Sequence, residues 1–112
     1  MWVVLNELFF FKKGNAFAGK TATIVGGGGG LGSGRSQYSL RQTGVFLDLH
    51  FLNKPEVMVR FFEGNTVNLE NGELLDETWK TRLVTQVEQL RDFTYQWKLG
   101  KEAFNQLTTT TK

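Results

Sequence analysis

Apolar and polar residues alternate over several short stretches of the chain, a pattern typical of β-strands with one buried face. In residues 45–51, apolar side chains occupy every second position, and Asp48 and His50 lie between them. The alternation recurs at 57–61 and at 66–69, with a turn at 63–65 between these two stretches. Three strands in succession at this spacing predict an antiparallel meander.

The amino-terminal part of the chain predicts further strands. Residues 2–11 form an apolar run that is interrupted only by Asn6 and Glu7. This run is either one long strand or a hairpin that turns at these two residues. A turn follows, in which Gly14 and Asn15 tolerate positive φ, and residues 17–25 are expected to return as a second strand.

The last third of the chain has helical periodicity. Apolar residues recur every three to four positions from Leu75 to Trp97, and Asp76 is a suitable N-cap. Gly100 predicts the end of the helix, so we expect a helix over 76–99 and a frayed tail over 108–112. The predicted fold is α+β: an antiparallel sheet, as a meander or half-barrel, covered by one long C-terminal amphipathic helix within a single domain, 1–112.

Composition limits the function classes. The chain has 112 residues, a formal net charge of +2 and no cysteine, which excludes disulfides, zinc–thiolate sites and cysteine nucleophiles. No apolar run approaches the roughly 20 residues that span a bilayer, so we expect a soluble, intracellular protein. The single histidine, His50, has no second histidine to join it as a metal ligand and is interpreted as structural. No catalytic constellation, cofactor site or metal site is predicted.

The glycine-rich stretch 26–34 (GGGGGLGSG) predicts a flexible loop or linker. Gly27, Gly29 and Gly32 also satisfy G-x-G-x-x-G directly after a predicted strand, and in this respect the stretch resembles the first turn of a short-chain dehydrogenase. That resemblance implies a pyrophosphate held at the N-terminus of a helix over 33–43, with Asp48 on the ribose. Residues 33–43 offer few apolar anchors for such a helix. Parallel strands on either side of the stretch would favour this hypothesis.

A second resemblance covers more of the chain. Residues 2–5 (WVVL), residues 8–13 (LFFFKK), the hairpin 53–69 and Trp79 resemble the strands and C-terminal helix of a pleckstrin-homology domain. The resemblance implies a bent sheet capped by a helix, which binds a protein or a phosphoinositide. The basic signature that holds inositol phosphates in that family has only a partial counterpart in Lys12, Lys13 and Lys20, so a protein partner is favoured.

These observations lead to a predicted function without catalysis. We expect a binding module for protein–protein interaction or assembly, with a protein partner or a second copy bound by one sheet face formed by Phe46, Asp48, Met58, Arg60 and Phe62. The alternatives are a single-stranded nucleic-acid-binding protein and, third, a truncated dinucleotide-binding fold. A candidate basic patch for an anionic partner consists of Lys12, Lys13, Lys20, Arg35 and Arg41.

Overall fold

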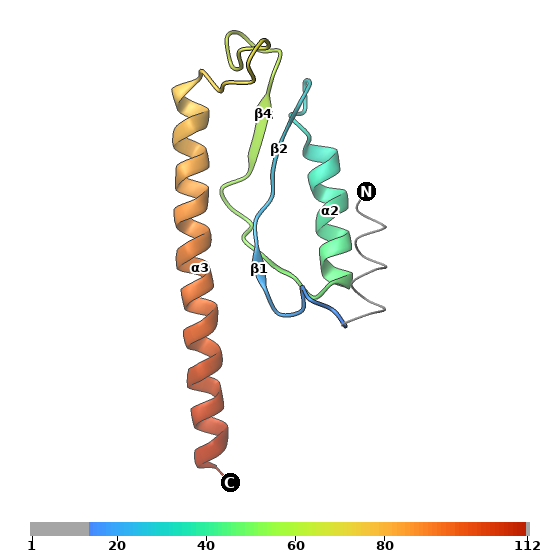
Figure 1. Ribbon diagram of the computed structural model, residues 1–112. Helices are drawn as coiled ribbons and strands as arrows, with labels where there is room; N and C mark the ends of the chain where they lie inside the picture. Colours follow the sequence, from blue (N-terminus) through green and yellow to red (C-terminus); the bar gives the residue numbers. More distant parts are fainter. Residues whose placement is uncertain (1–13, 112) are drawn as a thin grey trace.

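The computed structural model describes residues 14–111 (Figure 1). Short strands alternate with two helices in the order β1 (Thr21–Ala22), β2 (Val25–Gly28), α2 (Gly34–Phe46), β3 (His50–Phe51), β4 (Val57–Arg60) and α3 (Glu77–Thr110). The strand or hairpin expected at 2–11 lies outside the described residues.

The strands pair in parallel. Thr21 of β1 lies opposite His50 of β3, and β2 runs beside β4 in a register that ends with Gly28 opposite Arg60. The predicted antiparallel meander is therefore wrong. Helix α2 connects the paired strands, and such a crossover returns the chain in the same direction, whereas a tight turn reverses it. Residues 66–69, expected as a further strand, contribute one isolated antiparallel bridge between Val67 and Leu74.

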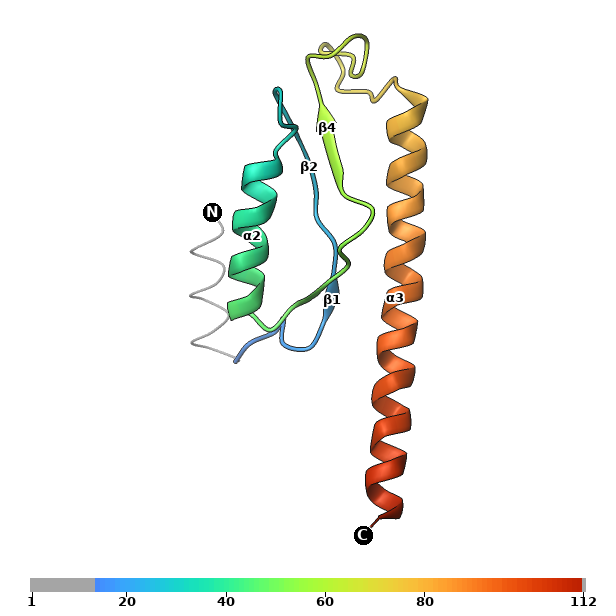
Figure 2. The same cartoon turned by 180° about the vertical axis from the view of Figure 1, so that it is seen from behind.

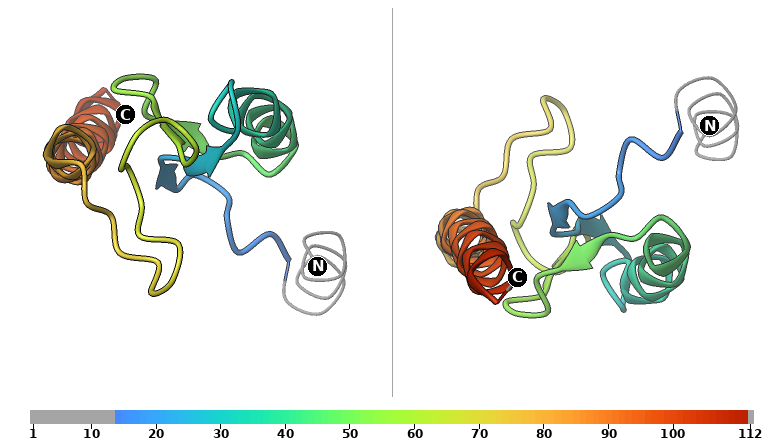
Figure 3. Two further views of the ribbon diagram at one scale, coloured as in Figure 1. Left: turned by 90° about the horizontal axis from the view of Figure 1, so that it is seen from above. Right: turned by 90° about the horizontal axis from the view of Figure 1, so that it is seen from below.

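The two helices cover opposite faces of the strands. Figures 1 and 2 show α3 on one side of the strands and α2 on the other, and the end-on views in Figure 3 show the same three layers. Four apolar side chains are buried between the layers: Ile24, Leu47, Val57 and Val59. The described core is small, and many apolar side chains, such as Val45 and Leu69, remain exposed.

Helix α2 corrects two predictions at once. The stretch expected as a flexible loop or linker over 26–34 is partly built into the fold, because Gly26–Gly28 pair with β4 and Gly34 begins the helix. Residues 45 and 46 are helical, and the strand expected at 45–51 is reduced to His50–Phe51. The alternating apolar residues of that stretch do not form a strand. Leu47, the most buried of them, is the C-cap of the helix.

The buried face of α2 is built from small and polar residues, which explains why few apolar anchors suffice. Gly34, Gln37 and Gly44 are its buried residues. A Cβ on Gly44 would overlap the ring of Phe51, and one on Gly34 would approach the Met58 sulfur to 3.2 Å. Side chains from the strands therefore fill the space that larger residues on the helix would otherwise occupy.

Helix α3 begins as the sequence predicts and ends later. The Asp76 carboxylate accepts hydrogen bonds from the backbone N–H groups of Thr78 (2.7 Å) and Trp79 (3.4 Å), which confirms the N-cap. The helix continues through Gly100 to Thr110, so the expected stop at 99 is wrong, and the tail expected to fray from 108 is helical as far as Thr110. A glycine costs a helix only about 1 kcal/mol, and good helix formers follow Gly100 in the sequence.

Candidate functional site

The connection between β2 and α2 is a compact turn at the carboxyl end of the strand. We call residues 28–34 the glycine turn. Two backbone hydrogen bonds close it, from Gly32 N–H to the Gly29 carbonyl (2.8 Å) and from Gly34 N–H to the Leu31 carbonyl (2.9 Å). The tip is exposed, whereas Gly32 and Gly34 are buried. In open sheets of parallel strands, ligands bind beyond the carboxyl ends of the strands, which is the position of this turn.

Glycine is required at particular positions of the turn. Gly32 has φ +53°, and a Cβ there would overlap the Met58 carbonyl oxygen, so the turn lies directly on β4. Gly29 and Gly30, by contrast, have nothing within 4 Å of where a Cβ would stand. The turn therefore combines an anchored base with an open tip at which a ligand could meet bare backbone.

The positive end of the α2 helix dipole has no negatively charged side chain of the first turn beside it. Its N-cap, Ser33, has the left-handed conformation (φ +78°) and makes no side-chain capping bond among the described residues. The first helical turn has no acidic side chain and contains Arg35, which adds positive charge to the positive end of the helix dipole. Free backbone N–H groups at such an end suit an anion or a strongly polarised oxygen.

Neighbouring segments complete the surroundings of the turn. At the end of β4, Arg60 donates to a Glu63 carboxylate oxygen at 2.9 Å. A cavity of about 500 Å³ lies against the glycines of β2. Its walls are mainly apolar and include Phe61 and Leu69 from the segment after β4, and Leu83 from α3. The cavity therefore places apolar surface next to the polar backbone groups of the glycine turn.

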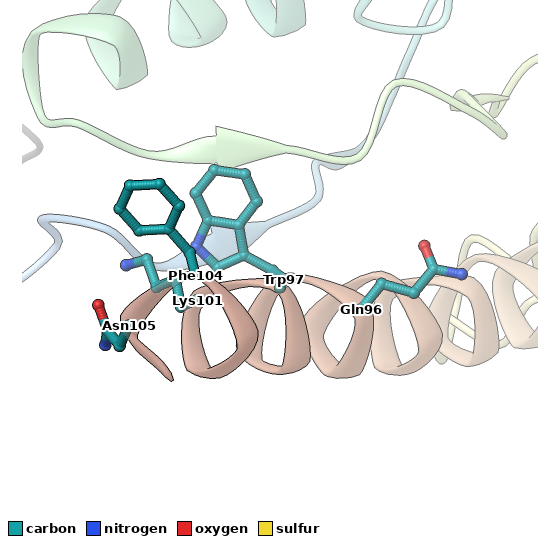
Figure 4. A pocket seen from close by; sticks show the side chains of 6 residues that line it. Gln96, Trp97, Lys101, Phe104 and Asn105 are labelled. Atoms are coloured by element: carbon teal, nitrogen blue, oxygen red, sulfur yellow. The ribbon is translucent and has the colours of Figure 1, made fainter. Parts of the chain in front are cut away.

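A second hollow, of about 440 Å³, lies on the carboxyl-terminal half of α3 (Figure 4). Trp97, Lys101 and Phe104 line it, and the Trp97 ring packs against His50 with centroids 3.9 Å apart. His50 begins β3, so this hollow lies toward the amino ends of the strands, away from the glycine turn. The hollow is therefore separate from the candidate site.

The predicted interface residues do not share one surface. Phe46 and Asp48 lie at the end of α2, Met58 and Arg60 on β4, and Phe62 beyond β4. Phe46 ends α2 shortly before β3 begins, whereas Phe62 follows the carboxyl end of β4, so the two exposed phenylalanines lie at opposite ends of the strand layer. The expected single face depended on a strand at 45–51 that the structure does not contain.

The candidate basic residues are also dispersed. Lys12 and Lys13 lie outside the described residues, and Lys20 is exposed before β1. Arg41 donates to the Asn53 side chain (3.3 Å) and the Leu52 carbonyl (3.4 Å), which fixes it against the segment after β3. Of this set, only Arg35 lies at the glycine turn within residues 14–111.

Asp48 does not reach the glycine turn. It lies two residues after α2 ends, with φ +56°, and its carboxylate is 4.0 Å from His50 Nε2. The ribose-binding role implied by the short-chain dehydrogenase resemblance is therefore incompatible with its position. Among residues 14–111, no group of three potential metal-binding side chains comes together, and neither helix is long and apolar enough to cross a membrane.

Two ion pairs on the surface of α3 raise the pKa values of their basic side chains. A hydrogen bond from Lys80 to Glu77 raises the pKa of the Lys80 ammonium, and a hydrogen bond to Asp92 raises the pKa of the Arg91 guanidinium. Both shifts reflect ordinary surface ion pairs within one helix. They do not point to acid–base chemistry at the turn.

Comparison with known proteins gives the chain relatives, although no family model matches it. It is 48% identical over 90 residues to Probable NADPH:quinone oxidoreductase 1 of Oryza sativa subsp. japonica, covering 80% of this chain and 46% of the relative. It is 50% identical over 80 residues to the NADPH:quinone oxidoreductase of Arabidopsis thaliana (71% and 41%). An NAD(P)H-dependent FMN reductase of Pseudomonas aeruginosa is 45% identical over 76 residues (67% and 40%). The chain thus spans less than half the length of these relatives.

These relatives overturn the functional predictions. Proteins named as oxidoreductases, at 45–50% identity, contradict a non-catalytic binding module that is not an enzyme. They also contradict the pleckstrin-homology-like and short-chain dehydrogenase resemblances. The first rested on aromatic strands and a tryptophan early in a helix, features that many sheet-and-helix domains share. The second rested on a glycine pattern that five consecutive glycines satisfy almost automatically.

Proposed function

We propose that this chain takes part in NAD(P)H-dependent reduction of a quinone, with FMN bound at the glycine turn. The similarity to quinone oxidoreductases and an FMN reductase carries the proposal. A match of 90 residues in a chain of 112 must include residues 23–90 wherever it begins. The similar stretch therefore contains β2, the glycine turn and the whole of α2.

The residues at the turn fit FMN. The molecule carries a phosphate and ring carbonyl oxygens, all of which accept hydrogen bonds. The uncapped N-terminus of α2 offers backbone donors, Arg35 adds a positive charge, and Gly29 and Gly30 leave the tip open to close approach. The apolar cavity beside Gly26 and Gly27 suits a flat ring.

The chain's own residues bind and orient in this proposal. When bound, FMN supplies a ring that accepts a hydride from a reduced nicotinamide and returns electrons to a quinone. The backbone N–H groups of the turn hold acceptor oxygens, and their fixed dipoles favour negative charge that develops on them. Phe61 and the neighbouring apolar side chains of the cavity offer packing surface to the ring.

The test is an assay of the full chain with NADPH, a benzoquinone and added FMN. We expect NADPH oxidation that requires both FMN and the quinone. A parallel titration with riboflavin, which lacks the phosphate, separates two modes of binding. Unchanged affinity for riboflavin would assign the turn to the ring, and lost affinity would assign it to the phosphate. NADPH oxidation that is independent of added FMN would overturn the proposal.

Self-association or binding to a protein partner is a separate proposal. It is supported by apolar side chains that the described structure leaves exposed, such as Phe62 (77% exposed) and Leu69 (75% exposed). Light scattering of the purified chain tests it, because a mass equal to one chain would contradict self-association.

A further inference from the structure

Two buried glutamines attach the helices to the strands. Gln37 of α2 is 3% exposed and Gln86 of α3 is 1% exposed. Gln86 donates through Nε2 to the Ile24 carbonyl (3.0 Å) and to the Pro55 carbonyl (3.2 Å), at the breaks between successive strands. Gln37 attaches a different part of the fold, because its hydrogen-bond partners lie on β4 and in the glycine turn.

The Gln37 side chain connects β4 to the N-cap of α2. Its Nε2 donates to the Val57 carbonyl at 2.7 Å and to Ser33 Oγ at 3.2 Å. The orientation of the amide is determined by Val57, since a carbonyl can only accept and the nitrogen must face it. The backbone N–H of Gln37 also donates to the Ser33 carbonyl at 3.0 Å. Ser33 is thus held from both its side chain and its main chain by one residue.

Ser33 needs this support because of its conformation. Its φ of +78° lies in the left-handed region, which is unfavourable for a residue with a Cβ. Its hydroxyl lies so close to Gly26 that a Cβ on this glycine would overlap Oγ. Residue 33 therefore fixes where the turn leaves β2 and where the first N–H groups of α2 point.

The bonding of Gln37 has a cost. Its Oε1 is buried and has no hydrogen-bond partner among the described residues. Leaving a buried acceptor unpaired is unfavourable, and an apolar side chain of the same shape would avoid it. Packing alone therefore does not explain a glutamine at this position. Its hydrogen bonds to Ser33 and Val57 do explain it.

We propose that Gln37 is a positioning residue that sets the conformation of the glycine turn for FMN, acting through Ser33. The inference rests on the proposed function for its ligand and on the hydrogen bonds above for its geometry. Gln37 does not touch the ligand in this proposal. It holds the N-cap so that the backbone donors of the turn face the acceptor oxygens without reorganisation.

The experiment compares Gln37→Met with Gln86→Met in the full chain. Each replaces a buried amide with an apolar side chain of similar shape, and each removes hydrogen bonds to backbone carbonyls of the central layer, so both variants should lower the melting temperature. We expect Gln37→Met to raise the Kd for FMN about tenfold, the value of one lost hydrogen bond of ordinary strength. Gln86→Met should leave that Kd within about twofold.

Two further measurements separate positioning from stability. Hydrogen exchange without ligand should show faster exchange at Gly32 and Gly34 in Gln37→Met and unchanged exchange there in Gln86→Met. Ser33→Ala should weaken FMN binding as Gln37→Met does, and the double variant should be no weaker than either single one.

The outcomes are distinguishable. If the wild-type chain does not bind FMN, the proposed function fails, and the exchange experiment still decides whether Gln37 holds the turn. If the wild-type chain binds FMN and Gln37→Met binds it equally well, the inference is wrong. Equal losses of FMN affinity in Gln37→Met and Gln86→Met would also overturn it, because they would show a general effect of destabilisation.

Discussion

Gly27 lies directly under the ring of Phe61, so closely that a Cβ at position 27 would overlap three of the ring carbons. The glycine belongs to β2 and the phenylalanine follows β4, two neighbouring parallel strands. The Phe61 ring therefore covers β2 next to the glycine turn, and both residues line the adjacent cavity. The part of the glycine stretch that belongs to β2 is therefore packed within the fold.

Gly27→Ala tests this contact. The new methyl group must displace the Phe61 ring, and overpacking of this kind typically costs about 1–3 kcal/mol. Because Phe61 is already 38% exposed, its ring can move toward solvent, so we expect the lower half of that range in a urea titration.

Gly29→Ala is the matched control, since a Cβ at position 29 meets nothing within 4 Å. It should change the free energy of unfolding by no more than about 0.5 kcal/mol. Equal stabilities of the two variants would show that Phe61 does not cover Gly27.

Gln86→Met should destabilise the chain. The substitution removes the donor for the Ile24 and Pro55 carbonyls, and each buried group left unpaired costs about 1–3 kcal/mol. Gln89→Met, at an exposed position of the same helix, should be nearly neutral. Thermal unfolding of both variants checks the difference, and similar melting temperatures would contradict the role of Gln86.

Asp76→Ala should weaken the start of α3. The carboxylate caps two backbone N–H groups, and loss of such a cap costs about 0.5–2 kcal/mol. Asp76→Asn retains a capping oxygen and should recover most of the stability. If denaturant titrations give the alanine and asparagine variants the same free energy of unfolding, the cap is not what Asp76 contributes.

Removal of residues 103–112 should have little effect on stability. The described side chains beyond Glu102 are all exposed, so the deletion removes few buried contacts. We expect a change below about 0.5 kcal/mol in the free energy of unfolding. A deletion from Asp92 onward is the contrast, because it also removes Trp97 and its packing against His50. A large loss of stability from the 103–112 deletion would show that this end of α3 packs against the rest of the molecule.

Part of this fold could be read from local sequence signals. Asp76 and the apolar spacing after it identified α3 and its N-cap, because caps and helical periodicity act over a few residues. The direction of the strands could not be read in this way. Alternation at 45–51 looks the same whether the residues form a strand or the end of a helix, and only the packing of Leu47 decides between them.

The glycine pattern and the helix expected over 33–43 pointed to the candidate site only as a third alternative, for a related reason. Helix α2 has few apolar residues, so its periodicity is weak, and it packs through Gly34, Gly44 and the hydrogen bonds of Gln37. These features depend on partners 20 residues away or on rings that fill the space beside a glycine. No pattern of neighbouring residues in the sequence predicts these contacts. The glycine pattern itself was visible but too easily satisfied to identify a ligand.

The most direct test of the account is the affinity of the glycine turn for FMN, measured by quenching of flavin fluorescence. Three chains are compared: the wild type, Gly30→Asp and Gly100→Asp. Both glycines have open space where a Cβ would stand, so neither substitution introduces a clash, and both add the same charge. Gly30 is at the tip of the turn, whereas Gly100 is on α3.

A carboxylate at the tip would repel the acceptor oxygens of FMN and would compete for the free N–H groups of α2. We predict that the wild type and Gly100→Asp bind FMN with the same Kd and that Gly30→Asp binds it at least about tenfold more weakly, a difference of about 1.4 kcal/mol. Equal affinity of all three chains for FMN would contradict the assignment of the glycine turn as the flavin site.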